Sequence, residues 1–419
     1  MRSTFVIVHR WAGLVTAVFL FVAGVTGAII SWDHELDEWL NPHLHQAILS
    51  GMPRSAIDLA AGIEQRDPRA RVIHMFMAPD EPGASLSFFL QPRVDPATGQ
   101  RYQLGYNQVF LDPVTGEERG RRQWGAVWPL SRETAVSFLY KLHYTLHIPP
   151  FWGSDRWGVR FLGIIAIIWT IDCFVGFVLT LPQRRRTKAE HGVAAPSPPK
   201  SFWSRWRPAW MIKTSGSAYR INFDLHRAFS LWTWSLLLVI AFTAFSLNLY
   251  REVFAPILRT VSSYTPSAFE QRTPTPLDKP IEPRMSYADI LARAAADGQQ
   301  RGWPEPVGVL FYSPQHGVYS ASFFHPGEAH GTGGVGPARL YYDGIDGRPL
   351  GGRLPWQGTA ADIFAQAQFP VHSGRIFGLP GRIMISIMGL VVAMLSLTGV
   401  LIWWRKQFPK RRRVPMAPG

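Results

Sequence analysis

The sequence predicts an α+β membrane protein with four transmembrane helices arranged as two tandem repeats. Four apolar runs, each long enough to cross a bilayer, are separated by polar stretches with helix and strand patterns. Motifs of the first half recur in the same order in the second half, which indicates an internal repeat. The expected segments are a first span within 1–32, an outer domain at 33–147, a second span within 148–181, a linker at 182–227, a third span at 228–250, a second outer domain at 251–372, a fourth span within 373–404 and a tail at 405–419.

The first apolar run, residues 11–32, has a tryptophan at each end and is expected to be an uncleaved membrane anchor. A cleaved signal peptide is the alternative, but the run is long for a signal core and has no clear A-x-A site. The later runs cover residues 158–181, 228–250 and 381–404, so the chain is expected to cross the membrane four times, with membrane lipid around it.

The first polar stretch reads as a helix at 55–66 followed by strands at 71–77, 84–91 and 104–111. The string VFLDPVTGEERG combines a strand, a D-P-x-T-G tight turn and a second strand, so we expect a hairpin there. An amphipathic helix from about 131 to 147 follows, and it places His143 and His147 one turn apart on one face.

The second polar stretch opens with a proline-rich connector that reaches about residue 283. The string MSYADILARAAADG then predicts a helix with Ser286 as its N-cap. Strands are expected at 307–312, 317–324 and 338–343, and RLYYDGIDGRPLGG repeats the strand–turn–strand pattern of the first stretch. The two stretches therefore match each other in content and order.

The formal net charge of +14 is concentrated beside the apolar runs. Residues 1–10, 182–227 and 405–419 together contain 18 Lys or Arg and two Asp or Glu, which leaves a net charge of −2 for the rest of the chain. Basic segments next to spans mark the cytoplasmic side, so both termini and the linker are expected there and both outer domains across the membrane. The charge is a topology signal, and we expect no nucleic-acid partner.

Several common chemistries have no support in the sequence. The single cysteine, Cys173, lies inside an apolar run, so the chain cannot form a disulfide, a zinc cluster or a cysteine-ligated iron–sulfur site. The G-x-G-x-x-G match at 331–336 precedes a strand and not a helix, which argues against dinucleotide binding. There is no P-loop, no G-x-S-x-G and no H-E-x-x-H, so a hydrolase has no visible machinery.

Histidines at the ends of the apolar runs are the strongest functional signal. By the expected topology, His9 and His226 lie at the cytoplasmic face, and His372 lies at the outer face with either His143 or His147. Spacing to the spans favours His147 over His143. Each face draws histidines from two helices, which is how two imidazoles hold a b-type haem between helices. The sequence therefore predicts two b-type haems, whereas the alternative is that these histidines are solvated interfacial groups.

Arginines and glycines accompany these histidines. Arg10, Arg227, Arg375 and Arg382 could pair with haem propionates, or they could be topology signals. Glycines within the runs would let a flat macrocycle or a neighbouring helix come close; they are Gly13, Gly24, Gly27, Gly163, Gly176, Gly389 and Gly399.

Two further features have both a structural and a functional interpretation. Asp172 interrupts the second apolar run, and an interhelical hydrogen bond is favoured over a proton-linked or redox-linked site. His325 and His330, with Glu328, could contact a metal or a substrate, but the histidines outside the runs are generally expected to be solvated.

In the strings HRWAGL, LHYTLH, LHRAF and VHSGRIFGLPGR, the chain resembles the PepSY-associated transmembrane family over nearly its whole length, excluding the linker and tail. The resemblance implies a bacterial inner-membrane protein with two periplasmic PepSY-like domains, each a helix against an antiparallel sheet. Some members are di-haem siderophore reductases, which implies reduction of ferric siderophore iron in the periplasm and release of Fe(II). The resemblance places haem ligands on His9, His226, His372 and one of His143 and His147.

Two alternative functions stay open at this point. The outer domains could bind a ligand or a protease without redox activity, or the haems could pass electrons to a different acceptor. No flavin or nicotinamide site is visible, so the electron donor would be a quinol or a partner protein. The sequence does not determine the siderophore, the haem potentials or the oligomeric state.

Overall fold

Three long apolar helices run through the middle of the molecule. In the computed structural model, which describes residues 1–48, 51–152, 154–183 and 201–408, they are α1 (Arg2–Ile30), α6 (Trp157–Thr180) and α13 (Gly378–Gln407). Each is long and apolar enough to cross a membrane. The first, second and fourth predicted spans therefore exist, and α1 already contains His9 because it begins well before residue 11. Residues 184–200 of the expected linker and residues 409–419 of the expected tail lie outside the described residues.

The third predicted span is not a straight helix. Helices α8 (Ala218–Trp232) and α9 (Trp234–Asn248) meet at Thr233 with a bend of 72°, so the described residues contain three candidate spans, or four if this pair is counted as one. The third predicted span, 228–250, is interrupted at Thr233; α8 begins ten residues before residue 228 and carries Arg220, Asp224 and Arg227, which do not suit a hydrocarbon core. Helix α8 is thus the polar half of the pair, and α9 is the apolar half.

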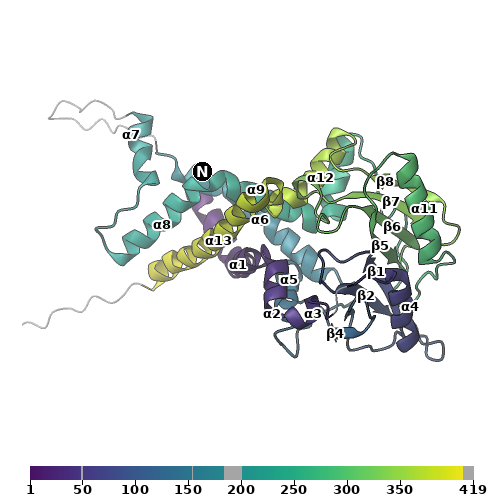
Figure 1. Ribbon diagram of the computed structural model, residues 1–419. Helices are drawn as coiled ribbons and strands as arrows, with labels where there is room; N and C mark the ends of the chain where they lie inside the picture. The colour runs from purple at the N-terminus through teal and green to yellow at the C-terminus, as the bar shows by residue number, and fades with distance from the viewer. Residues whose placement is uncertain (49–50, 153, 184–200, 409–419) are drawn as a thin grey trace, which may run out of the picture.

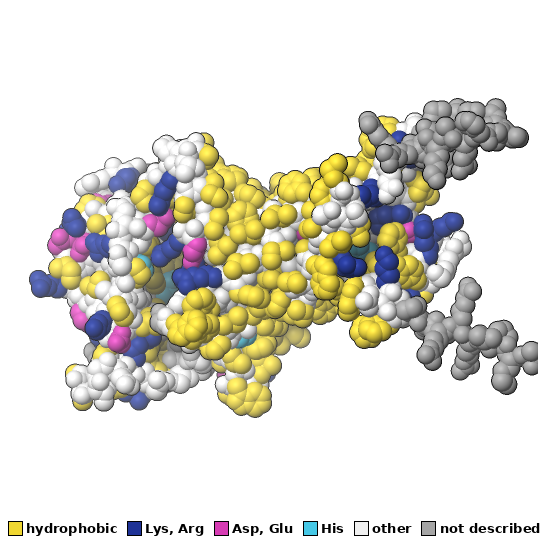
Figure 2. Space-filling model, turned by 180° about the vertical axis from the view of Figure 1, so that it is seen from behind, with side chains coloured by type: hydrophobic (Ala, Val, Ile, Leu, Met, Phe, Trp, Pro, Cys, Tyr) yellow, Lys and Arg dark blue, Asp and Glu magenta, His cyan; other side chains and the backbone are white. Residues whose placement is uncertain are grey.

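Hydrophobic side chains cover the surface of the helical part of the molecule. Figure 2 shows this apolar band between two ends that carry charged side chains. Exposed large residues in the band come from all three long helices, for example Val18 on α1, Ile171 on α6 and Leu390 on α13. Soluble proteins rarely leave so large a contiguous apolar surface exposed, so the band is the lipid-facing surface of a membrane protein.

One antiparallel sheet of eight strands lies at one end of the bundle (Figure 1). We call this the sheet end, and the opposite end, which carries α7 and α8, the basic end. The strand order is β4-β3-β2-β1-β5-β6-β7-β8. The strands are β1 (Ala70–Phe76), β2 (Leu86–Pro92), β3 (Gln108–Leu111), β4 (Glu118–Arg122), β5 (Val307–Ser313), β6 (Val318–Phe323), β7 (Ala338–Asp343) and β8 (Pro349–Arg353).

The two predicted outer domains share this sheet. The halves join where β1 pairs with β5, with Met75 opposite Leu310. Helix α4 (Ala56–Arg66) and helix α11 (Tyr287–Gln300) pack into one continuous core with the strands of both halves. The predicted N-cap is confirmed, because the Ser286 hydroxyl accepts a hydrogen bond from the Asp289 backbone N–H within a capping box. The two polar stretches thus form a single folded unit.

Short helices connect the sheet to the bundle. On the first half, α5 (Ala135–Thr145) leads into α6, and on the second half α12 (Ala360–His372) leads into α13. The remaining elements are α2 (Asp33–Leu40), α3 (Pro42–His45), α7 (Phe202–Trp206), η1 (Arg207–Trp210), η2 (Tyr250–Phe254), α10 (Ala255–Val261), η3 (Thr332–Gly334) and η4 (Arg375–Phe377).

A close crossing of α1 and α13 fixes the bundle. A Cβ atom added to Gly24 would lie 2.5 Å from the Gly389 carbonyl oxygen, so the two backbones touch at this point. Small residues at such crossings let transmembrane helices gain dispersion contacts that larger side chains prevent. Gly163 on α6 gives similar room to Leu249, the residue that follows α9. The expectation that glycines in the runs permit close helix approach is confirmed at these positions, whereas Gly13 has no atom within 4 Å of an added Cβ.

Candidate functional site

The histidines at the ends of the bundle lie in two pairs. At the basic end, His9 of α1 faces His226 of α8, with ring centres 6.3 Å apart and ring planes at 58°. At the sheet end, His143 of α5 faces His372 of α12, again with ring centres 6.3 Å apart and with planes at 50°. Each pair takes one histidine from each half of the chain, as the sequence predicted for the two faces.

At the basic end, both rings are held through their Nδ1 atoms. The Nδ1 atom of His9 lies 2.9 Å and 3.0 Å from the two carboxylate oxygens of Asp172 on α6. The Nδ1 atom of His226 lies 3.0 Å from Oγ1 of Thr398 on α13. The interhelical hydrogen bond expected for Asp172 is therefore confirmed, and its partner is one of the predicted site histidines.

At the sheet end, threonines hold both rings. The Nδ1 atom of His143 lies 3.1 Å from Oγ1 of Thr26 and 3.1 Å from the carbonyl oxygen of Ala23, both on α1. The Nδ1 atom of His372 lies 3.0 Å from Oγ1 of Thr243 on α9. Three of the four histidines thus have the same kind of anchor, a threonine hydroxyl on an apolar helix.

The threonine geometry defines which ring nitrogen carries the proton. The hydroxyls of Thr26, Thr243 and Thr398 each donate to the backbone carbonyl four residues earlier, at 2.7 Å, 2.8 Å and 2.8 Å. A hydroxyl has one proton to donate, so towards histidine each acts as an acceptor, and Nδ1 is the protonated nitrogen. The Nε2 atoms then keep free lone pairs, which is the form in which histidine binds a metal.

Each pair offers two imidazole rings as ligands. Among the described residues, no group of three or more His, Cys, Asp or Glu side chains is placed to hold a metal ion. Two ligands leave most of the coordination sphere of a transition metal open. A metal at either pair would therefore have to bring its remaining ligands with it.

His147 lies outside the sheet-end pair. Helix α5 ends at Thr145, and Leu146 and His147 both adopt the left-handed backbone conformation, with φ of 52°. The His147 ring turns back over α5, where it stacks on Phe138 with ring centres 4.5 Å apart, and its Nε2 donates to the Phe138 carbonyl at 2.9 Å. Spacing to the spans favoured His147, but the structure places His143 opposite His372, because the helix ends at Thr145 and the His147 ring turns back onto Phe138.

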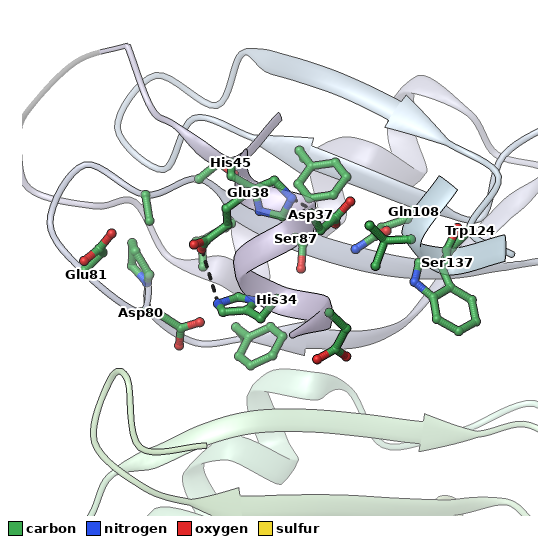
Figure 3. A pocket seen from close by; sticks show the side chains of 18 of the residues that line it. His34, Asp37, Glu38, His45, Asp80, Glu81, Ser87, Gln108, Trp124 and Ser137 are labelled. Carbon is green, nitrogen blue, oxygen red and sulfur yellow. Dashed lines mark hydrogen bonds and ion pairs between the residues drawn. The ribbon is translucent and has the colours of Figure 1, made fainter. Parts of the chain in front are cut away.

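A cavity of about 450 Å³ opens at the sheet end, and part of its wall is α5, the helix that carries His143. Its walls come from α2, α5, the strands β2 and β3 and the loop that precedes β2 (Figure 3). Tyr140 lines it and lies three residues before His143 on α5, so the cavity is one helical turn from this histidine pair. A volume of this size is typical of small-molecule sites.

The cavity wall is rich in carboxylates and contains a single arginine, Arg122. Burial by itself would raise the pKa of Asp37, but hydrogen bonds from His45 and Arg122 outweigh it and hold that pKa far below its usual range. Burial raises the pKa of Asp33, and the nearby Arg375 offsets only part of this rise. The carboxylates of the lining are Asp33, Asp37, Glu38, Asp80 and Glu81.

Comparison with known proteins places the chain in a family. The model of the PepSY-associated TM region matches residues 6–406, which is nearly the whole chain and includes both histidine pairs. The chain belongs to the PepSY-associated transmembrane family. The resemblance seen in the sequence motifs is thereby confirmed. A search of curated proteins finds no match to the chain.

In this PepSY-associated protein, three of the four predicted arginines have carboxylate partners. Arg227 donates to Asp224 at 2.7 Å, Arg382 donates to Glu35 at 2.7 Å, and Arg375 lies 3.6 Å from Asp33 while it also contacts His330. Arg10 is exposed and lies over the Trp11 ring at 5.6 Å. All four lie near one of the histidine pairs in sequence, and their role towards haem propionates stays a prediction.

Sequence reasoning missed the three threonine anchors of the PepSY-associated fold. A signal for them exists, because Thr26 and Thr398 are each followed by a glycine that lies against the anchored ring. An added Cβ at Gly27 would lie 2.9 Å from Cε1 of His143, and one at Gly399 would lie 3.3 Å from Cε1 of His226. These glycines were predicted to let a macrocycle or a neighbouring helix approach. In the structure, each of them lies against a histidine ring.

Proposed function

We propose that the protein is a haem-containing inner-membrane reductase that moves electrons across the bilayer and reduces ferric siderophore iron in the periplasm, releasing Fe(II). The observation that carries this proposal is the pair of facing imidazoles at each end of the bundle, with Nδ1 anchored and Nε2 free. Such pairs suit b-type haem, because two histidines would hold its iron and the macrocycle would supply the other nitrogen ligands.

The spacing of the rings supports a shared metal in each pair. Imidazole nitrogens bind transition metals at about 2 Å, so two rings on opposite sides of one ion have their centres about 6 Å apart. Both pairs have ring centres 6.3 Å apart. The same separation is therefore found at both ends of the bundle.

The two pairs stand at opposite sides of the apolar band. His9 and Gly27, the residue that lies against His143, are both on α1 and are about 27 Å apart along its axis. This is close to the thickness of the hydrocarbon core, roughly 30 Å. We infer that one site lies near each membrane face, with the basic end in the cytoplasm and the sheet in the periplasm.

A haem bound at each pair would supply one-electron chemistry, because its iron alternates between Fe(III) and Fe(II). The protein's own groups then have defined tasks. The anchors on Nδ1 orient each imidazole, and the surrounding apolar helices exclude water from the space between the two sites. The donor would be a quinol or a partner protein; a quinol releases two electrons and two protons and would reduce two ferric chelates.

The cavity at the sheet end is where we infer that the ferric chelate binds. It opens within one helical turn of His143, so an acceptor inside it would be close to the sheet-end haem. Siderophores bind Fe(III) tightly and Fe(II) weakly, so transfer of one electron releases the metal. The carboxylates of the wall favour chelates with a positive charge.

We also infer that the two halves are tandem repeats. In each half, the histidine of the basic end is anchored by the last long helix of that half, α6 for His9 and α13 for His226. In each half, the histidine of the sheet end is anchored by the first, α1 for His143 and α9 for His372. The same relation occurs twice, which is what duplication of one unit produces.

The decisive experiment is a reduced-minus-oxidised absorption spectrum of the purified protein, with haem content per chain. We expect two haems with the spectrum of bis-histidine ligation. His143→Ala should remove one of the two haems, whereas His147→Ala should leave both. A colourless preparation from haem-replete cells would overturn the proposal.

A further inference from the structure

One of the four histidine anchors is unlike the other three. His143, His226 and His372 donate to threonine hydroxyls, whereas His9 donates to the carboxylate of Asp172. Asp172 is the only acidic residue within α1, α6, α9 and α13, and its side chain is only 13% exposed. A carboxylate at this depth in a membrane protein calls for an explanation.

At His9, the carboxylate of Asp172 accepts the hydrogen bond that a threonine hydroxyl accepts at the other three histidines. Gly399 lies against His226, with 3.3 Å from an added Cβ to Cε1, and Gly176 lies against His9 in the same way, with 3.4 Å. If these two glycines are aligned, the position of Thr398 corresponds to Val175, which has no hydroxyl. Asp172 lies one helical turn before Gly176 and supplies the acceptor that Val175 cannot.

The two kinds of anchor affect a bound metal differently. A hydrogen bond to an ionised acceptor is stronger than one to a neutral hydroxyl, so it draws the Nδ1 proton further from the ring. The imidazole then becomes a more basic ligand, as carboxylate–histidine pairs do at metal sites. A more basic ligand, together with the negative charge itself, stabilises Fe(III) relative to Fe(II) and lowers the reduction potential.

We propose that Asp172 gives the basic-end site a lower reduction potential than the sheet-end site and thereby sets the direction of electron transfer. This inference rests on the proposed function. A haem held by His9 and His226 would give up one electron as its iron goes from Fe(II) to Fe(III), and a haem held by His143 and His372 would accept that electron as its iron goes from Fe(III) to Fe(II). The electron supplied by the donor therefore moves downhill towards the sheet and its cavity.

The arginines beside the basic-end histidines oppose this effect, but part of their charge is offset. Arg227 and Arg220 both pair with the fully buried Asp224, which offsets one of their two positive charges. Arg10 is exposed, and solvent and salt screen its charge. Asp172 directly contacts the ligand ring, and its charge acts at short range inside the bundle.

The test is a spectroelectrochemical titration of the haem-loaded protein, which gives two midpoint potentials. In Asp172→Asn, the side chain keeps its shape and an acceptor oxygen but loses its charge. We expect the lower potential to rise and the higher one to stay, which a purely structural role would not produce. Asp172→Glu, which restores the charge, should recover a low potential. The variant His226→Ala assigns the lower potential to the basic end.

A second variant covers the case in which Asp172→Asn disturbs haem binding. The double substitution Asp172→Val with Val175→Thr would build at His9 the anchor that His226 already uses. We expect this protein to keep both haems with a raised lower potential. Thr243→Val, which removes a neutral anchor from His372, should leave the lower potential in place.

Two kinds of failure are distinguishable. Absence of haem from the wild-type protein would overturn the proposed function. Two haems whose lower potential is unchanged or falls in Asp172→Asn would overturn the role of Asp172 and leave the function standing. Loss of the basic-end haem from both neutral variants would also overturn this role, because it would make the carboxylate a requirement for binding.

Discussion

The ion pair between Asp37 and Arg122 lines the cavity and connects α2 to the edge strand β4. We expect its removal to destabilise this edge of the sheet. Arg122 donates to both carboxylate oxygens of Asp37, at 2.8 Å and 2.7 Å, and the two side chains are 4% and 12% exposed. Asn41 and His45 donate to the same carboxylate at 2.9 Å and 3.1 Å. Asp37→Asn would leave the Arg122 charge buried without its counter-charge, which costs about 3–5 kcal/mol.

Hydrogen–deuterium exchange of peptides from β3 and β4 measures this loss, because local opening is better defined than global unfolding in a large membrane protein. A loss of about 3 kcal/mol accelerates exchange roughly a hundred-fold. The matched control is Glu118→Gln, which breaks the more exposed pair of Glu118 with Arg121 on the same strand and should cost at most about 1 kcal/mol. Equal exchange in Asp37→Asn and the wild type, or equal effects of both substitutions, would refute the reasoning.

Three other predictions follow from the same structure. Burial lowers the pKa of His74 to about 4, so the stability that the neutral ring contributes is present above about pH 6.5 and is lost as the pH falls towards 4. The variant His74→Leu should therefore flatten the pH dependence of the unfolding midpoint. An unchanged slope of the unfolding midpoint against pH would contradict this prediction. Gly24→Leu should lower the thermal stability of the detergent-solubilised protein, because an added Cβ already meets the Gly389 carbonyl at 2.5 Å, whereas Gly13→Ala, where nothing lies within 4 Å, should not. The double variant Asp80→Asn with Glu81→Gln should raise KM severalfold for a cationic ferric chelate at low salt and should change KM for an anionic chelate little. Stopped-flow oxidation of the reduced protein measures both values. Equal changes in KM for the two chelates would exclude a role for charge.

Local patterns in the sequence predicted most individual elements. The strand expected at 338–343 is β7, with the same bounds, and the helix expected at 55–66 is α4, which begins one residue later. Alternation and helical periodicity depend on neighbours within a few residues, so a short window contains the necessary information. The N-cap at Ser286 has the same local origin.

Features that depend on tertiary contacts could not be read in this way. The pairing of β1 with β5 joins strands from the two halves, and the sequence pattern of neither strand specifies which strand it pairs with. The bend at Thr233 breaks the third apolar run into two helices, and a hydropathy window does not detect such a break. The exclusion of His147 depends on two residues in the left-handed conformation, which helical spacing does not predict.

The candidate site explains why the two halves need to be in one molecule. Each histidine pair takes one ring from each half, and the anchor of each ring comes from the half to which the ring belongs. Neither half alone can therefore complete a pair, and the β1–β5 junction holds the halves in register at the sheet end. A symmetric dimer of one half would place identical anchors on both rings of a pair. Fusion in one chain lets the two anchors of one pair differ, and at the basic end they do, because Asp172 holds His9 while Thr398 holds His226.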